Sequence, residues 1–364
     1  MIEYDEFGPE KIFGVYDPKT KMKGFVVIFN TALGPAKGGI RMRPSASQEE
    51  AFGLARAMAW KCALAELPFG GGKSVIIADP KKLSQKEKEE IILAFAKAIK
   101  PINPSLYVAA PDIAMGENEM RIIAKENGPK GVTGKPKDMG GIPHELGSTG
   151  YGVALATKVA AEHLKINLKG ATVAIEGFGN VGTFTMKFLT EWGAKVVAVS
   201  DSKGMIYNKE GLDYKKLINA KKKSGSVTDY KEGIKHEGSE LFELAVDFLI
   251  PGALPDVITE KNVNKIKAKC IVEAANIPMS HEMEHILHER KILVVPDFVA
   301  NAGGVISSYV EYINGTEKDM WKLIEEKITK NTRVVLETAR KEKITPRDAA
   351  LKIAKDRIRK AMKK

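Results

Sequence analysis

The stretch ATVAIEGFGNVGTFTMKFLTEWGAKVVAVSD, residues 171–201, decides the fold of this chain. It opens with a short apolar run, continues through a turn that contains three glycines, and ends with a second apolar run that stops at Asp201. Between the two runs, apolar residues recur with the spacing of a helix. A strand, a glycine turn, a helix and a second strand in this order form one βαβ unit.

The glycine turn has the spacing G-x-G-x-x-G, formed here by Gly177, Gly179 and Gly182. Such glycines permit a tight turn and let a pyrophosphate approach the amides at the helix N-terminus, while an acid about 20 residues further on accepts ribose hydroxyls. Asp201 stands at the position of that acid. The context therefore favours dinucleotide binding over a merely tight turn.

The composition predicts a folded protein with two domains. The chain has 364 residues, of which 44% are hydrophobic and 28% charged, and this length exceeds one ordinary core. No apolar run reaches the roughly 18 residues of a membrane span and no apolar leader opens the chain, so we expect no membrane partner and a cytoplasmic location. Cys62 and Cys270 lie far apart, which argues against a disulfide framework or a thiolate metal site.

The formal net charge of +11 raises the question of a nucleic-acid partner. A nucleic-acid-binding face needs concentrated basic residues, because it binds phosphates by releasing counterions. Here the lysines are interspersed with glutamates, and only the tail KDRIRKAMKK, residues 355–364, is one-sided. Nucleic-acid binding is therefore not predicted.

Helical and strand patterns alternate along the chain, which predicts an α/β fold. We expect a first domain over 1–143, a second domain over 144–329 that contains the βαβ unit and binds the dinucleotide, and C-terminal helices over 330–364 that pack back on the first domain. Residues 31–45, which are rich in glycine and proline, are expected to form a loop. Besides the βαβ unit, strands are expected at 25–30, 74–78, 106–112, 245–251, 270–276 and 292–297, and helices from Ser47, over 85–100, after Thr316 and, as a short helix, after Thr345.

A second glycine-rich stretch, LPFGGGKSVIIADP at 67–80, sets three glycines before Lys73. A P-loop would need a glycine where Leu67 stands and a helix after the lysine, whereas residues 74–78 have the pattern of a buried strand. The stretch therefore predicts Lys73 at the mouth of a strand. The glycines would let a backbone or a ligand approach closely.

Three lysines in the first half of the chain stand in glycine-rich or apolar stretches of sequence. Lys37 lies among glycines, Lys61 falls on an apolar helical stripe, and Lys73 closes the glycine run. Each alone is typical of a surface lysine, but together they indicate a pocket for carboxylates. Clustered cations would also lower the pKa of one amine toward neutrality, where it can do acid–base work. Asp112, after a predicted strand end, would be the acidic partner; the alternative is a turn aspartate.

The residues HEMEH at 281–285 match H-E-x-x-H, and His288 adds a third imidazole. This pattern raises the alternative of a zinc peptidase. The predicted helix is short, is capped by Ser280 and leads into a strand, which is typical of a crossover packed on a sheet. We therefore expect a solvated polar face and predict no metal ligand.

The chain resembles the glutamate, leucine, phenylalanine and valine dehydrogenase superfamily from about Phe25 to Asn314. The resemblance rests on the motifs GPAKGGIRM, WKCALAELPFGGGK, APD, TGKP, STGYG, GFGNVG, VSDSKG and PDFVANAGGV. It implies a substrate domain followed by a Rossmann domain, with the C-terminal helices returning to the first. It also implies NAD(P)-dependent oxidative deamination of an amino acid by a homo-oligomer, with a hexamer favoured and an octamer as the alternative.

By this resemblance the catalytic residues are Lys73, which activates water, and Asp112, which moves protons. The predicted substrate-binding residues are Lys37, Lys61, Ala110, Asn301 and Ser308. The predicted cofactor-binding residues are Thr149, Gly177, Phe178, Gly179, Asn180, Val181, Gly182, Asp201, Ala253 and Asn276. NAD is the preferred coenzyme because Asp201 repels a 2′-phosphate, but Ser202 and Lys203 could accommodate one, which leaves NADP open.

Two positions bear on the substrate side chain. In the leucine-type pattern the glycine loop reads G-P-A-L-G-G and an aliphatic residue stands in place of Ser308, whereas this chain has Lys37 and Ser308 at these positions. An ammonium and a hydroxyl converging on one pocket would suit a second carboxylate, because a charge-assisted hydrogen bond contributes about 1.5–3 kcal/mol. This favours L-glutamate and 2-oxoglutarate. Leucine-type substrates stay the alternative, because VYDPKTKMKGFVVIFNTALGPA is more similar to the leucine branch.

Overall fold

The computed structural model describes residues 2–363, apart from the side chain of His144, and divides into two compact units. The first unit runs up to residue 144 and includes 305–320 and the residues after 352, while the second comprises 145–304 and 321–352. The expected block 330–364 is therefore split between the units. The reason is side-chain packing: Trp321 contacts Tyr151, and Arg347 pairs with Glu284, so both belong with the second unit.

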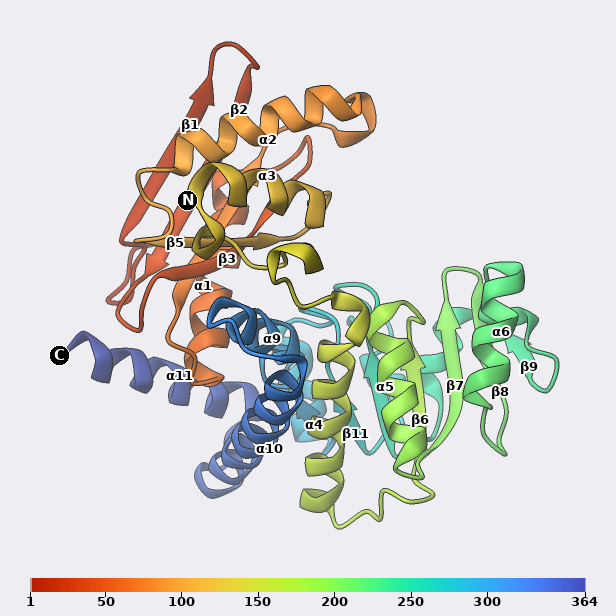
Figure 1. The fold of residues 1–364 in the computed structure, drawn as a ribbon. Helices are drawn as coiled ribbons and strands as arrows, with labels where there is room; N and C mark the ends of the chain where they lie inside the picture. The colour runs from red at the N-terminus through yellow and green to blue at the C-terminus, as the bar shows by residue number, and fades with distance from the viewer. Residues whose placement is uncertain (1, 364) are drawn as a thin grey trace. The chain divides into compact units, whose positions relative to one another are not determined.

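The first unit contains a mixed five-stranded sheet of order β1-β2-β4-β3-β5 (Figure 1). β1 and β2 are antiparallel, β2 and β4 are antiparallel, and β3 runs parallel to both β4 and β5. The strands are β1 (Lys11–Asp17), β2 (Met22–Asn30), β3 (Ala36–Met42), β4 (Gly70–Ile76) and β5 (Tyr107–Pro111). Its own helices are α1 (Gln48–Leu64), α2 (Gln85–Ile99) and α3 (Glu117–Asn127), with α9 (Gly303–Tyr312) contributed from later in the chain.

The two faces of this sheet bury different side chains, because successive residues of a strand point to opposite faces. Val26 and Ile28 of β2 belong to the core shared with α2 and α3, whereas Phe29 packs edge-on against Trp60 of α1. Helix α1 begins directly after Ser47, as expected, and the Ser47 hydroxyl caps it by accepting a hydrogen bond from the Glu50 amide at 3.1 Å.

Two expectations for this unit are wrong. Residues 36–42 form β3 instead of a loop, and Gly70, Gly71 and Gly72 lie within β4 instead of before it. The glycines serve close packing: a Cβ on Gly71 would lie 2.4 Å from the Ala55 carbonyl oxygen of α1, and one on Gly70 would lie 1.8 Å from the Asn30 carbonyl oxygen. They let α1 and the neighbouring strands approach closely, as the expectation of a close backbone approach required.

The second unit contains a seven-stranded sheet of order β12-β11-β10-β6-β7-β8-β9. The first five strands in this order are parallel, and β8 and β9 extend the sheet as antiparallel strands that the sequence patterns did not predict. The strands are β6 (Thr172–Glu176), β7 (Lys195–Asp201), β8 (Gly204–Tyr207), β9 (Ile234–His236), β10 (Phe248–Pro251), β11 (Cys270–Val272) and β12 (Leu293–Val295). The helices are α4 (Ser148–Leu164), α5 (Asn180–Glu191), α6 (Tyr214–Ser224), α7 (His281–Glu289), α8 (Asp297–Ala300), α10 (Glu317–Glu342) and α11 (Pro346–Met362), of which α10 and α11 are shared with the first unit and α11 is longer than expected.

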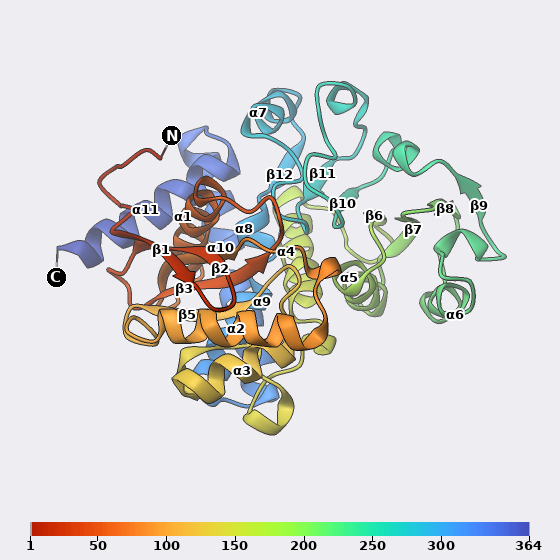
Figure 2. The same cartoon turned by 90° about the horizontal axis from the view of Figure 1, so that it is seen from above.

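The predicted βαβ unit is β6, α5 and β7 (Figure 2). β7 lies on one side of β6 and β10 on the other, so the strand order reverses beside β6. Ligands of open α/β sheets bind at such a switch point, outside the carboxyl ends of the strands. Among residues 2–363, no helix combines the length and apolarity needed to cross a membrane.

Candidate functional site

In the first unit, Lys73 and Asp112 meet directly. Lys73 lies on β4 and Asp112 follows β5, and the Lys73 ammonium donates a hydrogen bond to the Asp112 carboxylate. Lys73 is 7% exposed, and burial lowers its pKa even though Asp112 opposes the shift. A Cβ on Gly39 would lie 3.1 Å from the Lys73 Nζ atom and 2.8 Å from the Asp112 Cβ atom, so this glycine makes room for the pair.

Arg41 of β3 holds the Asp112 carboxylate from another side. One of its Nη atoms lies 3.2 Å from an oxygen of Asp112, and the other lies 2.7 Å from an oxygen of Glu50. Burial alone would raise the pKa of Asp112, but the ammonium of Lys73 and the guanidinium of Arg41 outweigh it and hold that pKa below its usual value. Asp112 is therefore ionised and fixed in place, and it is not a free turn residue.

Lys37, on β3, is 1% exposed. Its ammonium donates hydrogen bonds to the Ala109 carbonyl oxygen at 3.0 Å and to the Thr133 hydroxyl at 2.6 Å. Burial lowers its pKa from the ordinary 10.5 to about 7. The alternative of a solvent-facing lysine is wrong for this residue.

Lys61 lies in the last turn of α1 and is half-buried. Its neighbour Cys62 is buried, and burial raises the pKa of the Cys62 thiol to about 12 against the opposing charges of Lys37 and Lys61. Lys37 also feels the charge of Lys73. The charges of Lys37 and Lys73 therefore act on each other, and those of Lys37 and Lys61 both act on the Cys62 thiol. Ala110 is half-buried on β5 and is paired with Gly39 of β3.

The loop after Thr133 is fixed by Glu311 of α9. The Glu311 carboxylate accepts hydrogen bonds from the amides of Gly134, Lys135 and Ile142 and from the Lys135 ammonium at 2.6 Å. Ser308 lies one turn earlier on the same helix and is half-buried. Glu311 thereby positions the loop that presents the Thr133 hydroxyl to Lys37.

In the second unit, the glycines of the G-x-G-x-x-G turn have distinct roles. Gly177 has φ of 91° and a Cβ there would lie 2.7 Å from that of Ala253, while a Cβ on Gly182 would lie 1.9 Å from the Gly177 carbonyl oxygen. A Cβ on Gly179, the N-cap of α5, would meet nothing within 4 Å. Protein packing does not require a glycine at this position, whereas a pyrophosphate at the amides of Asn180 and its neighbours does.

Phe178 is buried within this turn, and Val181 lies in the first turn of α5. The turn is tied to the loop after β10 by Glu176, whose carboxylate accepts hydrogen bonds from the amides of Gly252 and Ala253 at 2.9 and 2.8 Å. Ala253 is therefore placed at the switch point beside Gly177. The residues present fit a bound dinucleotide.

Asp201 ends β7 as predicted, but its carboxylate is already engaged. It accepts hydrogen bonds from the amides of Lys203 and Val227, from the Ser226 hydroxyl, and from the Lys221 ammonium at 3.0 Å. The side chain is 5% exposed. Its charge is partly neutralised by Lys221, so its repulsion of a 2′-phosphate is weaker than the sequence suggests.

Asn276 and Asn301 lie together. The Asn301 amide nitrogen donates to the Asn276 side-chain oxygen at 3.0 Å and to the Ala274 carbonyl oxygen at 3.2 Å. The Asn301 side-chain oxygen is buried without a hydrogen-bond partner among the described residues. Such an acceptor suits an amide or amine donor of a ligand. Thr149, in the first turn of α4, has its hydroxyl 2.9 Å from where a Cβ on Gly304 would lie.

Sequence reasoning gave no role in the site to Arg41, Glu50, Thr133, Glu311 or Lys221. Arg41 and Thr133 occur in the motifs GPAKGGIRM and TGKP, which indicated the family resemblance but not the contacts that these two residues make. Glu311 bonds to Gly134, 177 positions away in the sequence, so only the fold brings them together. Lys221 lies 20 positions after Asp201, on the helix α6, and no motif links the two residues.

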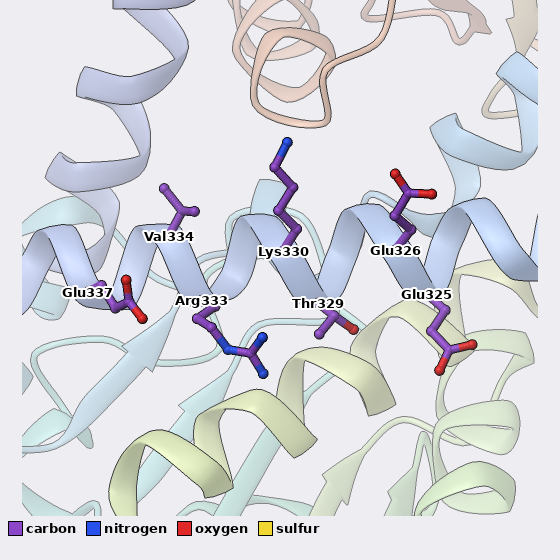
Figure 3. A pocket seen from close by; sticks show the side chains of 7 residues that line it. All are labelled: Glu325, Glu326, Thr329, Lys330, Arg333, Val334 and Glu337. Atoms are coloured by element: carbon purple, nitrogen blue, oxygen red, sulfur yellow. The ribbon is translucent and has the colours of Figure 1, made fainter.

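A shallow surface hollow runs along α10 in the second unit (Figure 3). Its polar side chains include Arg333, which pairs with Glu162 of α4 at 2.9 Å. None of the predicted site residues lines this hollow, so it has no part in the candidate site. The lining residues are Glu325, Glu326, Thr329, Lys330, Arg333, Val334 and Glu337.

Comparison with known proteins identifies relatives over most of the chain. Residues 140–364 match the family model of glutamate/leucine/phenylalanine/valine dehydrogenases, and residues 9–128 match the dimerisation domain of the same enzymes. A glutamate dehydrogenase from Aeropyrum pernix is 42% identical and the match covers 92% of this chain and 84% of the relative.

Two further relatives differ in coenzyme. An NADP-specific glutamate dehydrogenase from Saccharolobus shibatae is 40% identical, and the match covers 92% of this chain and 83% of the relative. An NAD-specific glutamate dehydrogenase from Staphylococcus aureus is 39% identical, and the match covers 87% of this chain and 78% of the relative. Among solved structures, a hetero-hexameric glutamate dehydrogenase from Thermus thermophilus, in a leucine-bound form, matches with a TM-score of 0.86 and 28% identity, covering 97% of this chain and 89% of that one.

Proposed function

The chain belongs to the glutamate/leucine/phenylalanine/valine dehydrogenase family, and from this we propose that it catalyses the reversible oxidative deamination of L-glutamate to 2-oxoglutarate and ammonium with a nicotinamide dinucleotide. It is accordingly an oxidoreductase acting on the CH–NH₂ group of amino acids. The substrate half of the reaction is assigned to the first unit and the coenzyme to the second.

One observation carries the choice of glutamate: the buried ammonium of Lys37. An ammonium has three N–H groups, and the described hydrogen bonds to Ala109 and Thr133 use two of them. The third is available for the side-chain carboxylate of glutamate, with Ser308 as a further donor. A leucine side chain would leave this buried amine without a charged partner, and polar sites can reject such analogues by roughly 10⁴-fold or more.

In the proposed mechanism Lys61 holds the α-carboxylate and Lys37 the side-chain carboxylate, which orients the Cα–H bond. A nicotinamide dinucleotide held by Gly177, Gly179 and Gly182 would supply the acceptor for the hydride that leaves Cα. Lys73, whose pKa is lowered by burial, takes a proton from the water that attacks the resulting iminium carbon. Asp112, in contact with Lys73, then moves the protons that allow ammonium to leave.

The coenzyme preference proposed here is NAD with NADP also accepted. Asp201 favours NAD, while its pairing with Lys221 reduces the penalty for a 2′-phosphate. A cytoplasmic homo-oligomer, with a hexamer favoured over an octamer, completes the proposal; the relative from Thermus thermophilus, a hetero-hexamer, supports the number of subunits.

A panel of L-amino acids assayed by NADH and NADPH absorbance tests the substrate. We expect the highest kcat/KM for glutamate, and a preference for leucine or valine would refute the assignment. The double substitution Lys37→Leu with Ser308→Val should abolish most glutamate activity. If glutamate kcat/KM stayed unchanged in this variant, the proposed pocket would be wrong.

The catalytic roles have a separate test. Lys73→Ala and Asp112→Asn should each lower kcat by orders of magnitude while coenzyme binding, followed by fluorescence quenching, survives. Near-normal turnover in either variant would contradict the roles given to these residues.

A further inference from the structure

Half of the six histidines of the chain lie on α7, and two of them face a carboxylate from α11. His281 and His285 are one helical turn apart, so their side chains lie on the same face of α7. Asp348 lies in the first turn of α11, and both helices contribute these residues to the second unit. We propose that His281, His285 and Asp348 form a binding site for one divalent transition-metal ion, with Zn²⁺ as the best-matched ion.

The geometry of the three side chains is close to that of a metal site. The His281 Nε2 atom lies 3.0 Å from one oxygen of Asp348, and the His285 Nε2 atom lies 3.8 Å from the other. One ligand atom from each residue can be chosen so that all lie within 4.8 Å of one another. Around Zn²⁺ the ligand atoms lie about 2.0–2.2 Å from the ion, so small rotations of the two exposed histidine side chains toward Asp348 would close the site.

The two helices are held together beneath the cluster. The Arg347 side chain, adjacent to Asp348, donates to both oxygens of Glu284 at 2.7 and 2.8 Å, and Glu284 lies between the two histidines on α7. Glu284 is 2% exposed. The backbones that carry the three ligands are therefore fixed by a buried ion pair, which lowers the entropic cost of assembling the site.

The carboxylate is also oriented before any ion binds. The Thr345 hydroxyl, at the N-terminus of α11, donates to one oxygen of Asp348 at 2.8 Å and accepts from the Asp348 amide at 3.1 Å. Partners of this kind fix the orientation of metal ligands, and their loss typically lowers metal affinity 10–100-fold. Asp348 is 67 positions after His281 in the sequence, so the H-E-x-x-H motif alone could not reveal it.

The donor set indicates the class of ion. Two imidazole nitrogens and one carboxylate oxygen suit Zn²⁺, Co²⁺ or Ni²⁺ better than Mg²⁺ or Ca²⁺, which prefer oxygen ligands. Three protein ligands leave at least one coordination position for water. The proposal is one of metal binding and linkage of α7 to α11, and it is independent of the reaction proposed above.

Equilibrium dialysis of the chelator-stripped full chain against Zn²⁺, with the bound metal measured by elemental analysis, tests the site. We expect about one Zn²⁺ per chain at saturation, and His281→Ala, His285→Ala and Asp348→Asn should each weaken binding at least tenfold. His288→Ala is the matched control, because His288 is exposed on the same helix but lies outside the cluster; it should bind like wild type.

Thermal unfolding supplies a second measurement on the same proteins. Zn²⁺ should raise the Tm of the wild type and of His288→Ala, and should leave the Tm of His281→Ala with His285→Ala unchanged, because an ion that binds only the folded state stabilises it. Co²⁺ should give a ligand-field absorption spectrum in the wild type that this double variant lacks. The proposal is overturned if wild type and double variant bind Zn²⁺ equally, or if His288→Ala weakens binding as much as His281→Ala.

Discussion

Lys37 is buried, and burial makes the charged form of its amine less favourable. The charge of Glu311 opposes this effect only in part. The described hydrogen-bond partners of Lys37 are a carbonyl oxygen and a hydroxyl, both of them neutral. Burial accordingly lowers its pKa to about 7. Near neutral pH its ammonium is therefore ready to lose a proton in the free protein and to regain it when an anion binds.

This predicts that dicarboxylate binding depends on pH. Above pH 7 the free amine is deprotonated and must take up a proton to bind a carboxylate, so affinity falls as pH rises by up to about tenfold per pH unit. The measurement is the inhibition constant of glutarate against pH. Pentanoate, which lacks the second carboxylate, is the control, and equal slopes for the two inhibitors would show that Lys37 does not meet that carboxylate.

Lys221 gives a residue-scale prediction for the coenzyme. It pairs with the Asp201 carboxylate at 3.0 Å, so Lys221→Ala should leave that carboxylate uncompensated and increase its repulsion of a 2′-phosphate. We expect kcat/KM with NADP to fall about tenfold while kcat/KM with NAD changes little. Lys222→Ala, an exposed neighbour on α6, is the control; if both variants respond alike, the pairing has no bearing on coenzyme choice.

At the residue scale, the sequence predicted those site residues that lie in recognisable motifs. It did not predict residues that reach the site only because the chain folds. Lys73 and Asp112 were predicted as partners, and they are in contact. Arg41 and Glu311 were not, because one acts across the sheet on Asp112 and the other holds a loop about 170 residues away in sequence. Contacts between residues far apart in the sequence leave no periodic pattern, so they cannot be predicted from a single sequence.

At the scale of elements, local patterns predicted the βαβ unit and the capped helices, and they failed at glycine-rich strands. β3 and β4 carry glycines where strand propensity is low, yet the parallel pairing of these strands and the packing of α1 override that preference. The short antiparallel strands β8 and β9 were missed because a run of three or four residues has no reliable alternation.

The packing of α1 on β4 yields a prediction with a matched control. In Gly71→Ala the new methyl would lie 2.4 Å from the Ala55 carbonyl oxygen and 2.5 Å from the Ala59 Cβ atom, so we expect a loss of about 1–3 kcal/mol in the free energy of unfolding. Gly53→Ala, on the exposed face of α1 with nothing within 4 Å of the new methyl, should instead gain about 0.5–1 kcal/mol. Urea unfolding compares them, and a Gly71→Ala protein as stable as wild type would disprove the packing role.

At the scale of the whole molecule, the chain passes between the two units at residues 144/145, 304/305, 320/321 and 352/353. Sequence patterns predicted two domains but could not place the later crossings, because α10 and α11 each continue from one unit into the other without a break in periodicity. What places the start of α11 in the second unit is a buried cluster: Arg347 with Glu273, Glu284 and Asp297.

Because of this cluster, we expect Arg347→Met to lower the free energy of unfolding strongly, by an amount that depends on pH. Burial, with the neighbouring carboxylates, raises the pKa values of Glu273 and Glu284 even while Arg347 opposes the shift. Removing the guanidinium leaves buried carboxylates unpaired, which typically costs about 3–5 kcal/mol. Because the folded state of the variant then binds more protons than the unfolded state above the ordinary glutamate pKa of about 4.5, its stability should fall as pH rises from 5 to 8.

Urea unfolding of wild type and Arg347→Met across this pH range measures the effect, with Arg333→Met as the control. Arg333 pairs with Glu162 at 2.9 Å, but both side chains are about half exposed, and such a surface pair contributes about 0–1 kcal/mol. The two substitutions remove the same group from the same unit and differ in burial. If Arg347→Met lowered the free energy of unfolding as little as Arg333→Met does, and equally at every pH, the cluster would not hold α11 in place.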